Sequence, residues 1–209
     1  MEHIVLERIP HKKIRAFIQE QINNRVRSVK DLQVSFRPGD CTKKFLKHEE
    51  VFEAKYNIDT VWDSYNKTGL NLVFTGSLVS FALMLSKRNE LDVLYKEETF
   101  SATEVGQVYF MNLSVLKGII QIAVSYEIVI KNKEERVLEF AYIKGGKSIG
   151  FQRIKLDSVG NNRTRITHTT HYRSQSKFRD RFIYPYFHTK VLEEYHTNML
   201  NYMDHKLIG

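Results

Sequence analysis

The chain has 209 residues, of which 42% are hydrophobic, 27% are charged and 12% are aromatic. This composition excludes intrinsic disorder, because disordered chains are poor in aromatic residues, and the length suits one domain with an extension better than two domains. The single cysteine, Cys41, excludes an internal disulfide bond and fits a reducing compartment. The N-terminal residues contain no apolar stretch of signal-peptide length, so we expect a cytoplasmic protein.

The net charge of +8 is carried mainly by the two ends of the chain. Residues 1–50 have 11 basic and 7 acidic side chains, and residues 151–209 have 10 basic and 5 acidic ones. Such a distribution is compatible with a transient contact with an anionic membrane or with nucleic acid, and we interpret it as a solvated basic surface. A nucleic acid partner is not expected.

The N-terminal quarter of the sequence predicts a helix and then a break. Apolar residues recur at helical spacing between Ile9 and Asp31, and Pro10 suits the first turn of a helix. Arg37-Pro38-Gly39-Asp40 then interrupts the pattern. We therefore expect residues 1–45 to form an N-terminal helical extension and residues 46–209 to form the main domain.

The main domain is predicted to begin with a strand over residues 45–56. Asn57 or Asp59 then caps a helix whose apolar side includes Trp62, and a second short helix is expected near residues 70–75. Residues 68–86 carry no charge, but they include too many polar side chains for a confident membrane span, so we interpret them as buried protein.

From residue 78 onwards the apolar period changes from helical to alternating. Strands are expected over residues 78–86, 105–116, 120–130, 137–143, 149–156 and 163–172, separated by short polar or glycine-rich turns. A long helix follows over residues 182–207, with an apolar stripe on one side. Seven strands joined by short turns predict an antiparallel sheet, and the terminal helix can cover its apolar face.

This order of elements resembles the START-like superfamily, also called SRPBCC, which includes the major birch pollen allergen family. Three stretches between residues 46 and 207 carry the resemblance. They are Glu49–Ala54 with Asn57–Trp62, the run of hairpins from Val105 to Tyr172 with Gly150-Phe151-Gln152 and Thr164–Thr167 in it, and the helix from Pro185.

The resemblance implies an α+β helix-grip fold, in which a seven-stranded curved antiparallel sheet wraps a long C-terminal helix around an apolar pocket. Members of the superfamily bind lipids, sterols, quinones or hormones, and some are cyclases or other enzymes. The extension at residues 1–45 departs from the superfamily pattern. Covering the pocket and forming a dimer are both open roles for it.

Strand alternation and the helix stripe predict which side chains face the pocket. Choosing Ile166 as inward on its strand brings His168 and Tyr172 to the same face. The expected ligand-binding residues are Tyr109, Ile122, Val124, Tyr126, Phe140, Tyr142, His168, Tyr172, His188, Val191, Leu192, Tyr195 and Met199. The acidic residues Glu127 and Glu139 fall on the polar side of their strands and are interpreted as solvated.

His188 is the candidate catalytic residue, because it lies on the apolar stripe and burial moves a histidine into a useful acid–base range. The alternative is a hydrogen-bonded core histidine. No metal site is expected, since His188 and His196 lie too far apart along one helix and the sequence has no CxxC or HExxH pattern. No cofactor is implied. Ala141–Ser148 resembles a loosened phosphate-binding loop, but a strand follows it, so we interpret it as a hairpin turn.

Three hypotheses for function follow. The first is a module that binds a hydrophobic small molecule such as a lipid or quinone. The second is an enzyme of the cyclase or aromatase kind, in which His188 and a tyrosine transfer protons. The third is an interaction protein with a filled core, whose working surface is the basic and aromatic segment 173–184. An internal cavity of several hundred Å³ would count against the third.

Overall fold

The computed structural model describes residues 1, 3–98, 102–116 and 118–208. Short helical turns and helices are η1 (Leu6–Arg8), α1 (Lys12–Asn23), η2 (Val29–Asp31), α2 (Ile58–Lys67), α3 (Leu70–Val73), the π-helical turn η3 (Arg179–Ile183) and α4 (Tyr184–Ile208). The strands are β1 (Leu46–Ala54), β2 (Val79–Ser86), β3 (Val93–Tyr95), β4 (Gln107–Val115), β5 (Ile120–Asn132), β6 (Val137–Tyr142), β7 (Ile149–Ser158) and β8 (Thr164–Arg173).

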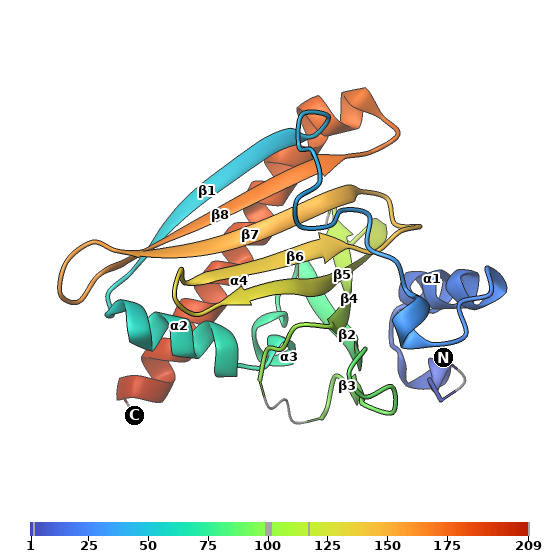
Figure 1. Ribbon diagram of the computed structural model, residues 1–209, viewed down its shortest axis with the longest axis horizontal. Coiled ribbons are helices and arrows are strands. Elements are labelled where there is room, and N and C mark those ends of the chain that lie inside the picture. The colour runs from blue at the N-terminus through green and yellow to red at the C-terminus, as the bar shows by residue number, and fades with distance from the viewer. Residues whose placement is uncertain (2, 99–101, 117, 209) are drawn as a thin grey trace.

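The strands form one antiparallel sheet in the order β1-β8-β7-β6-β5-β4-β2-β3. The sheet curves, and α4 crosses one face of it (Figure 1). Most neighbouring strands follow one another in the chain, as expected for strands joined by short turns. The α+β helix-grip class predicted from the sequence is confirmed.

The number of strands differs from the expected seven. The sheet in the described part of the chain has eight strands, and the additional one is β3, which pairs with β2 at the edge. Only three residues long, β3 is too short to show an alternating pattern in the sequence. The uncharged stretch interpreted as buried protein forms α3 and β2, and β2 is almost wholly buried. Among the described residues, no helix has the length and apolar character needed to cross a membrane.

The helix predicted from Ile9 to Asp31 is shorter in the structure. Helix α1 ends at Asn23, and Arg25 has a φ angle of 66°, in the left-handed region that ends helices. The chain then re-enters a single helical turn, η2, where Ser28 and Asp31 form a capping box. The apolar residues beyond Asn23 do not belong to the same helix. They are the buried and partly buried side chains of η2 and of the segment that leads into it.

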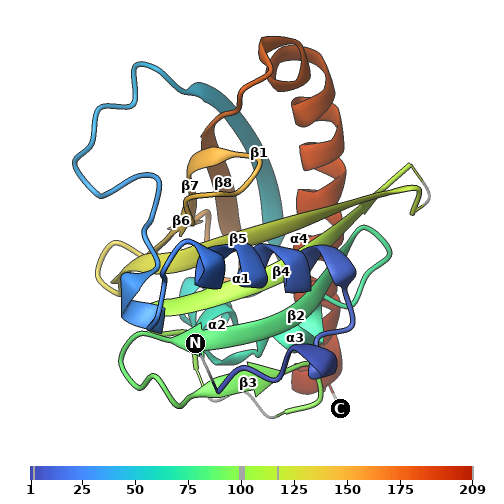
Figure 2. The ribbon, with the colours of Figure 1, turned by 90° about the vertical axis from the view of Figure 1, so that its right-hand side faces the viewer.

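The N-terminal extension packs on the outer face of the sheet, opposite α4. Ile14, Phe17 and Ile18 of α1 belong to an apolar cluster that also contains Leu83 and Phe110. The rings of Phe17 and Phe110 lie 6.1 Å apart. Figure 2 shows α1 lying across β4 and β5, with α4 beyond the sheet. The extension therefore covers the outer face of the sheet and not the face that meets α4. A role in dimer formation and the division of the chain into an extension and a main domain at residue 45 stay predictions.

Glu139 is buried, which corrects the expectation of a solvated side chain. Its side chain is only 1% exposed, although it points to the outer face of β6. Strand register places Arg153 of β7 directly opposite, and its Nε and Nη2 donate to the Glu139 carboxylate at 2.9 and 2.7 Å. Alternation identified the face correctly, but it could not show that a neighbouring arginine covers that face.

A carboxylate on α4 fixes the helix to the start of β2. Glu194 accepts hydrogen bonds from the backbone N–H groups of Ser77, Leu78 and Val79 at 2.8–3.0 Å. The Ser77 hydroxyl donates to the same carboxylate at 3.1 Å. Gly76 leaves the room for it, since a Cβ there would lie 2.0 Å from the Glu194 carboxyl group. Glu194 therefore anchors α4 to this edge of the sheet.

Replacing Glu194 by alanine is expected to lower the free energy of unfolding by about 2–4 kcal/mol, because several charge-assisted hydrogen bonds to backbone N–H groups are lost together. Urea unfolding followed by circular dichroism measures the change. Glu193→Ala removes the same group from an exposed neighbouring position and should cost less than about 0.5 kcal/mol. Equal effects of the two variants would contradict this role of Glu194.

Candidate functional site

A cavity of about 560 Å³ lies between α4 and the concave face of the sheet. Its walls come from β4, β5, β6, β7 and β8 on one side and from η3 and α4 on the other. The curvature of the sheet creates it, because the side chains of α4 fill only part of the concave face. A volume in this range suits a drug-sized molecule.

Most of the residues predicted from alternation lie in the wall of this cavity. They are Ile122, Val124, Tyr126, Phe140, Tyr142, His168, His188, Val191, Leu192 and Tyr195. Three strands, β5, β6 and β8, and the helix stripe therefore bring together side chains that lie up to 73 positions apart, from 122 to 195. Their part in binding a ligand stays a prediction.

Tyr109, Tyr172 and Met199 face the interior but lie outside the cavity wall. The Tyr109 hydroxyl donates to Gln107 at 2.6 Å, and the Tyr172 hydroxyl donates to the backbone oxygen of Asp180 at 2.7 Å. Met199 is fully buried in the main apolar cluster together with Trp62. Alternation assigns a face but not a depth, and at these positions the core is already filled.

Several wall residues were missed by the sequence analysis. Met111 and Leu113 of β4 lie opposite Val124 and Ile122 of β5 in the strand register, so pairing the two strands would have found them. Arg179 also lines the cavity, from the turn before α4, and no periodic pattern in the sequence places it there.

A chain of hydrogen bonds crosses the core beside the cavity. His196 of α4 bonds to Tyr65 of α2 at 2.6 Å and to His168 of β8 at 2.9 Å. His168 bonds in turn to Gln152 of β7 at 2.8 Å. The chain then continues through Gln152 Nε2 to Tyr142 at 2.5 Å, and from Tyr142 to Tyr184 at 3.0 Å. Four of its members line the cavity: Tyr142, Gln152, His168 and Tyr184.

The orientation of the Gln152 amide determines which nitrogen carries the proton on each histidine of this chain. Gln152 Oε1 accepts only, so His168 carries its proton on Nε2 and accepts on Nδ1. His196 must then donate from Nε2, and it accepts from the Tyr65 hydroxyl on Nδ1. At the other end, Tyr142 accepts from Gln152 and shares a hydrogen bond with Tyr184 in which either hydroxyl can be the donor. One hydroxyl proton of the Tyr142–Tyr184 pair is left for another acceptor.

His188 forms a second polar group, at the end of the cavity near the start of α4. Its Nδ1 lies 3.1 Å from Nδ1 of His48 on β1. His48 Nε2 lies 3.3 Å from the carboxylate of Glu50 and 3.0 Å from the Thr189 hydroxyl. Since Glu50 can only accept, His48 carries its proton on Nε2 and accepts from His188 Nδ1. This leaves His188 Nε2 unprotonated, and no side chain or backbone group in the described part of the chain bonds to it.

Burial keeps the central histidines neutral. It lowers the pKa of His196 from 6.5 to about 3. Burial, followed by the neighbouring histidines, also lowers the pKa of His168 and of His188 well below 6.5. Burial raises the pKa of Tyr195 and of Tyr184 well above 10.0. The site is therefore built of neutral donors and acceptors. Among the described residues, no three His, Cys, Asp or Glu side chains are grouped so as to hold a metal ion.

The curved sheet, the long helix and the cavity between them define a helix-grip fold, similar to that of solved START-like structures. No protein-family model matches the sequence, and no curated protein matches it. Solved structures with the same fold include norcoclaurine synthase from Thalictrum flavum, at 14% identity and a TM-score of 0.55 over 78% of this chain and 96% of that one. Major latex-like protein 151 from Panax ginseng has 14% identity and a TM-score of 0.55, over 76% of this chain and 97% of that one.

The KanY protein is a third structure of this kind, with 10% identity and a TM-score of 0.54 over 77% of this chain and 98% of that one. All three are covered almost completely, whereas about a fifth to a quarter of this chain has no counterpart in them. At these identities the likeness shows a shared fold. The fold is one whose neighbours include ligand-binding proteins, and some of these are enzymes.

The buried histidines are expected to make folding sensitive to mild acid. The unfolded chain binds protons at these positions below about pH 6.5, whereas the folded chain binds them only at much lower pH. The free energy of unfolding is therefore fully retained above pH 6.5 and decreases as the pH falls toward 3. Each histidine contributes a slope of up to ~1.4 kcal/mol per pH unit. Urea unfolding between pH 8 and pH 5 measures the slope.

His168→Gln keeps hydrogen-bonding groups but removes one of these titrations, so its slope should be shallower by about 1.4 kcal/mol per pH unit. His205→Gln, at an exposed position near the end of α4, provides the matched control and should leave the slope unchanged. A stability that stays level between pH 7 and pH 5 would show that the three histidines are not buried as neutral groups.

Proposed function

We propose that this protein binds a hydrophobic or amphipathic small molecule, such as a lipid or a quinone, in the cavity between α4 and the sheet. The cavity of about 560 Å³ is the observation that supports the proposal. A filled core would be the more stable arrangement, because each unfilled volume lowers packing energy. The same cavity counts against the hypothesis of an interaction protein with a filled core.

The two sides of the cavity differ in polarity, and this favours an amphipathic ligand. On β4 the wall is made of Met111, Leu113 and Val115, which offer no hydrogen bond of ordinary strength. On the opposite side, Tyr184 and His188 present polar atoms. Among the described wall residues there is no carboxylate, while Lys147 and Arg179 are cationic.

The chain of hydrogen bonds beside the cavity indicates which polar group the ligand carries. Whichever of the two hydroxyls donates, the Tyr142–Tyr184 pair retains one proton to donate, and both residues line the cavity. A ligand carbonyl, ester or carboxylate oxygen beside this pair would accept that proton. Quinones and fatty acyl compounds both combine such an oxygen with a large apolar body.

A second candidate function is proton transfer to a bound molecule, in the manner of a cyclase or aromatase. The arrangement of His188, His48 and Glu50 supports it, because it leaves His188 with an unprotonated Nε2 and a fixed ring orientation. A neutral His188 could remove a proton from a ligand and pass the positive charge toward Glu50. Norcoclaurine synthase, solved in complex with dopamine and hydroxybenzaldehyde, is an enzyme by name and has the same fold. That likeness extends to the fold alone.

Filling the cavity is expected to abolish binding. Val124→Trp places a large ring inside the cavity and should weaken the binding of 1-aminoanthracene, a neutral apolar fluorophore, by about tenfold or more. Fluorescence titration measures the affinity, and native mass spectrometry tests whether a small molecule that accompanies the wild-type protein is lost. Val51→Trp makes the same exchange at an exposed position on β1 and should bind normally. Equal binding by Val124→Trp and wild type would place the ligand elsewhere.

Replacing His188 separates the two functions. If the protein is a binding module, His188→Ala should change the affinity for the extracted ligand by less than about tenfold, since only one polar contact is removed. If it is an enzyme, the same variant should abolish loss of water from the ligand and exchange of its C–H protons with D₂O, both followed by mass spectrometry. His171→Ala, on the outer side of β8 and outside the cavity wall, controls for loss of a histidine. Wild-type protein that neither converts nor exchanges any bound ligand would eliminate the enzyme hypothesis.

A further inference from the structure

The mouth of the cavity can be located from residues that line it and are also exposed. Leu116 and Ile120, on either side of the turn between β4 and β5, are 51% and 43% exposed and belong to the wall. Ile183 of η3 is 41% exposed and also lines the cavity, as does the exposed Lys147. The opening therefore lies between the β4–β5 turn, the β6–β7 turn and the start of α4.

Apolar side chains gather on both sides of this opening. Of the twelve large apolar side chains that are exposed in the described part of the chain, seven lie between residues 116 and 120 or between residues 178 and 186. Ile119 is 83% exposed, and Phe178 and Phe182 are 66% and 62% exposed. Single exposed apolar residues are ordinary, but a group of this size around one opening marks an interaction surface.

The aromatic side chains on the helical side form a stripe. Phe178, Phe182 and Tyr186 follow one another at intervals of four residues, so they project from one side of η3 and α4. The rings of Phe178 and Phe182 lie 5.3 Å apart. This stripe occupies the end of α4 that projects beyond the sheet (Figure 1).

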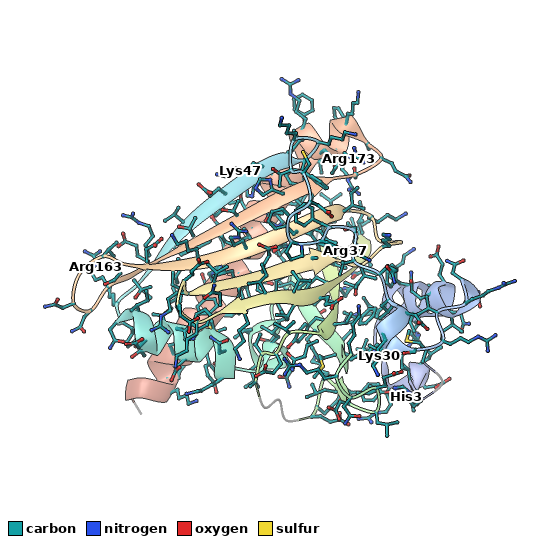
Figure 3. The ribbon with its side chains drawn as sticks, viewed as in Figure 1. His3, Lys30, Arg37, Lys47, Arg163 and Arg173 are labelled. Carbon is teal, nitrogen blue, oxygen red and sulfur yellow. The ribbon has the colours of Figure 1, made fainter. Side chains whose placement is uncertain are left out.

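Cationic side chains lie next to the stripe, and several of them have no acidic partner among the described residues. Residues 173–190 contain five basic residues and one acidic residue. The acidic one, Asp180, is 3% exposed and accepts hydrogen bonds from Ser174. No carboxylate in the described part of the chain forms an ion pair with Lys177, Arg181 or Lys190. Figure 3 shows Arg173 at the same end of the molecule, beside η3.

We infer that this rim surface docks on a lipid bilayer that contains anionic lipids. We define the rim surface as Leu116, Ile119, Ile120, Phe178, Phe182, Ile183 and Tyr186, together with Lys177, Arg181 and Lys190. Protruding apolar and aromatic side chains enter the interfacial layer of a bilayer, while the lysines and arginine contact lipid phosphates and carboxylates. The charge is complementary to an anionic membrane, and the apolar groups surround a cavity whose wall is itself apolar.

Docking in this orientation would set the mouth of the cavity against the membrane. A hydrophobic molecule could then pass between the bilayer and the cavity without crossing water. This matters because exposing apolar surface to water is unfavourable. The inference goes beyond the proposed ligand binding, because the surface and its charges would favour membrane contact even if the cavity stayed empty.

Vesicle flotation tests the inference with wild-type protein. Binding is expected to vesicles of phosphatidylcholine mixed with phosphatidylserine, to be weak on phosphatidylcholine alone, and to decrease at high salt because the charges are exposed. The double variant Lys177→Glu/Arg181→Glu and the double variant Phe178→Ser/Phe182→Ser should each lower the partition by about tenfold or more. Wild-type protein that does not float with anionic vesicles would overturn the inference.

Matched controls separate the rim surface from general stickiness. Leu72→Ser/Leu91→Ser removes two exposed leucines from other parts of the molecule, and Arg37→Glu reverses an exposed charge on the outer side of the sheet. Both should float like wild type. Equal losses in the control and rim variants would overturn the assignment of this surface. Phe182→Trp provides a direct readout, because its fluorescence should shift to the blue only with anionic vesicles.

Other occupants of the rim surface give different results. Sedimentation would reveal a dimer that disappears in Phe178→Ser/Phe182→Ser, and a mobility shift would reveal binding of single-stranded RNA; either result without vesicle binding would replace the membrane. Val124→Trp, which blocks the cavity, should still float with anionic vesicles. Failure of ligand binding and failure of membrane docking can therefore be observed separately.

Discussion

The hydrogen-bonded chain from α2 across α4 to the sheet is the constraint on which the rest of the site depends. Its members are Tyr65, His196, His168, Gln152, Tyr142 and Tyr184. Each buried polar group must have a partner, since an unpaired one costs about 1–3 kcal/mol. The rotation of α4 about its axis is thereby fixed, because turning the helix would separate His196 from α2 and β8 and Tyr184 from β6 at once. Glu194 fixes the same helix from its other side, through the backbone at the start of β2.

This constraint also explains why the cavity has one polar side. The chain crosses β6, β7 and β8, so these strands and the first turns of α4 contribute polar atoms of the wall that are joined by hydrogen bonds. On β4 and β5 most of the wall is apolar, with side chains such as Leu113 and Ile122, and Ser125 and Tyr126 of β5 add two hydroxyl groups. A single molecule that satisfies both sides needs an apolar body and a hydrogen-bonding oxygen. If His188 transfers protons, the reaction would take place on this polar side of the cavity.

The sequence predicted the fold and much of the cavity wall, because both depend on local periodicity. Alternation placed Ile122 and Val124 inward, and the helical stripe placed Leu192 inward, since each pattern is set by the backbone geometry of one element. The sequence did not predict the features that depend on contacts between different helices and strands. Arg153 buries Glu139 from the next strand, and His196 finds its partner, His168, 28 positions earlier in the chain. Distances of this kind have no signature in a single sequence.

The N-terminal extension explains why β4 is buried on both of its faces. Val108 and Phe110 alternate with Tyr109 and Met111 on β4, and all four are buried, so this strand cannot have one wet side. Helix α1 covers the outer set, which lets the inner set remain dedicated to the core and the cavity. A sheet stabilised from outside can tolerate an unfilled volume inside, because the packing lost at the cavity is offset by apolar burial on the other face. The extension thus supports the cavity without touching it.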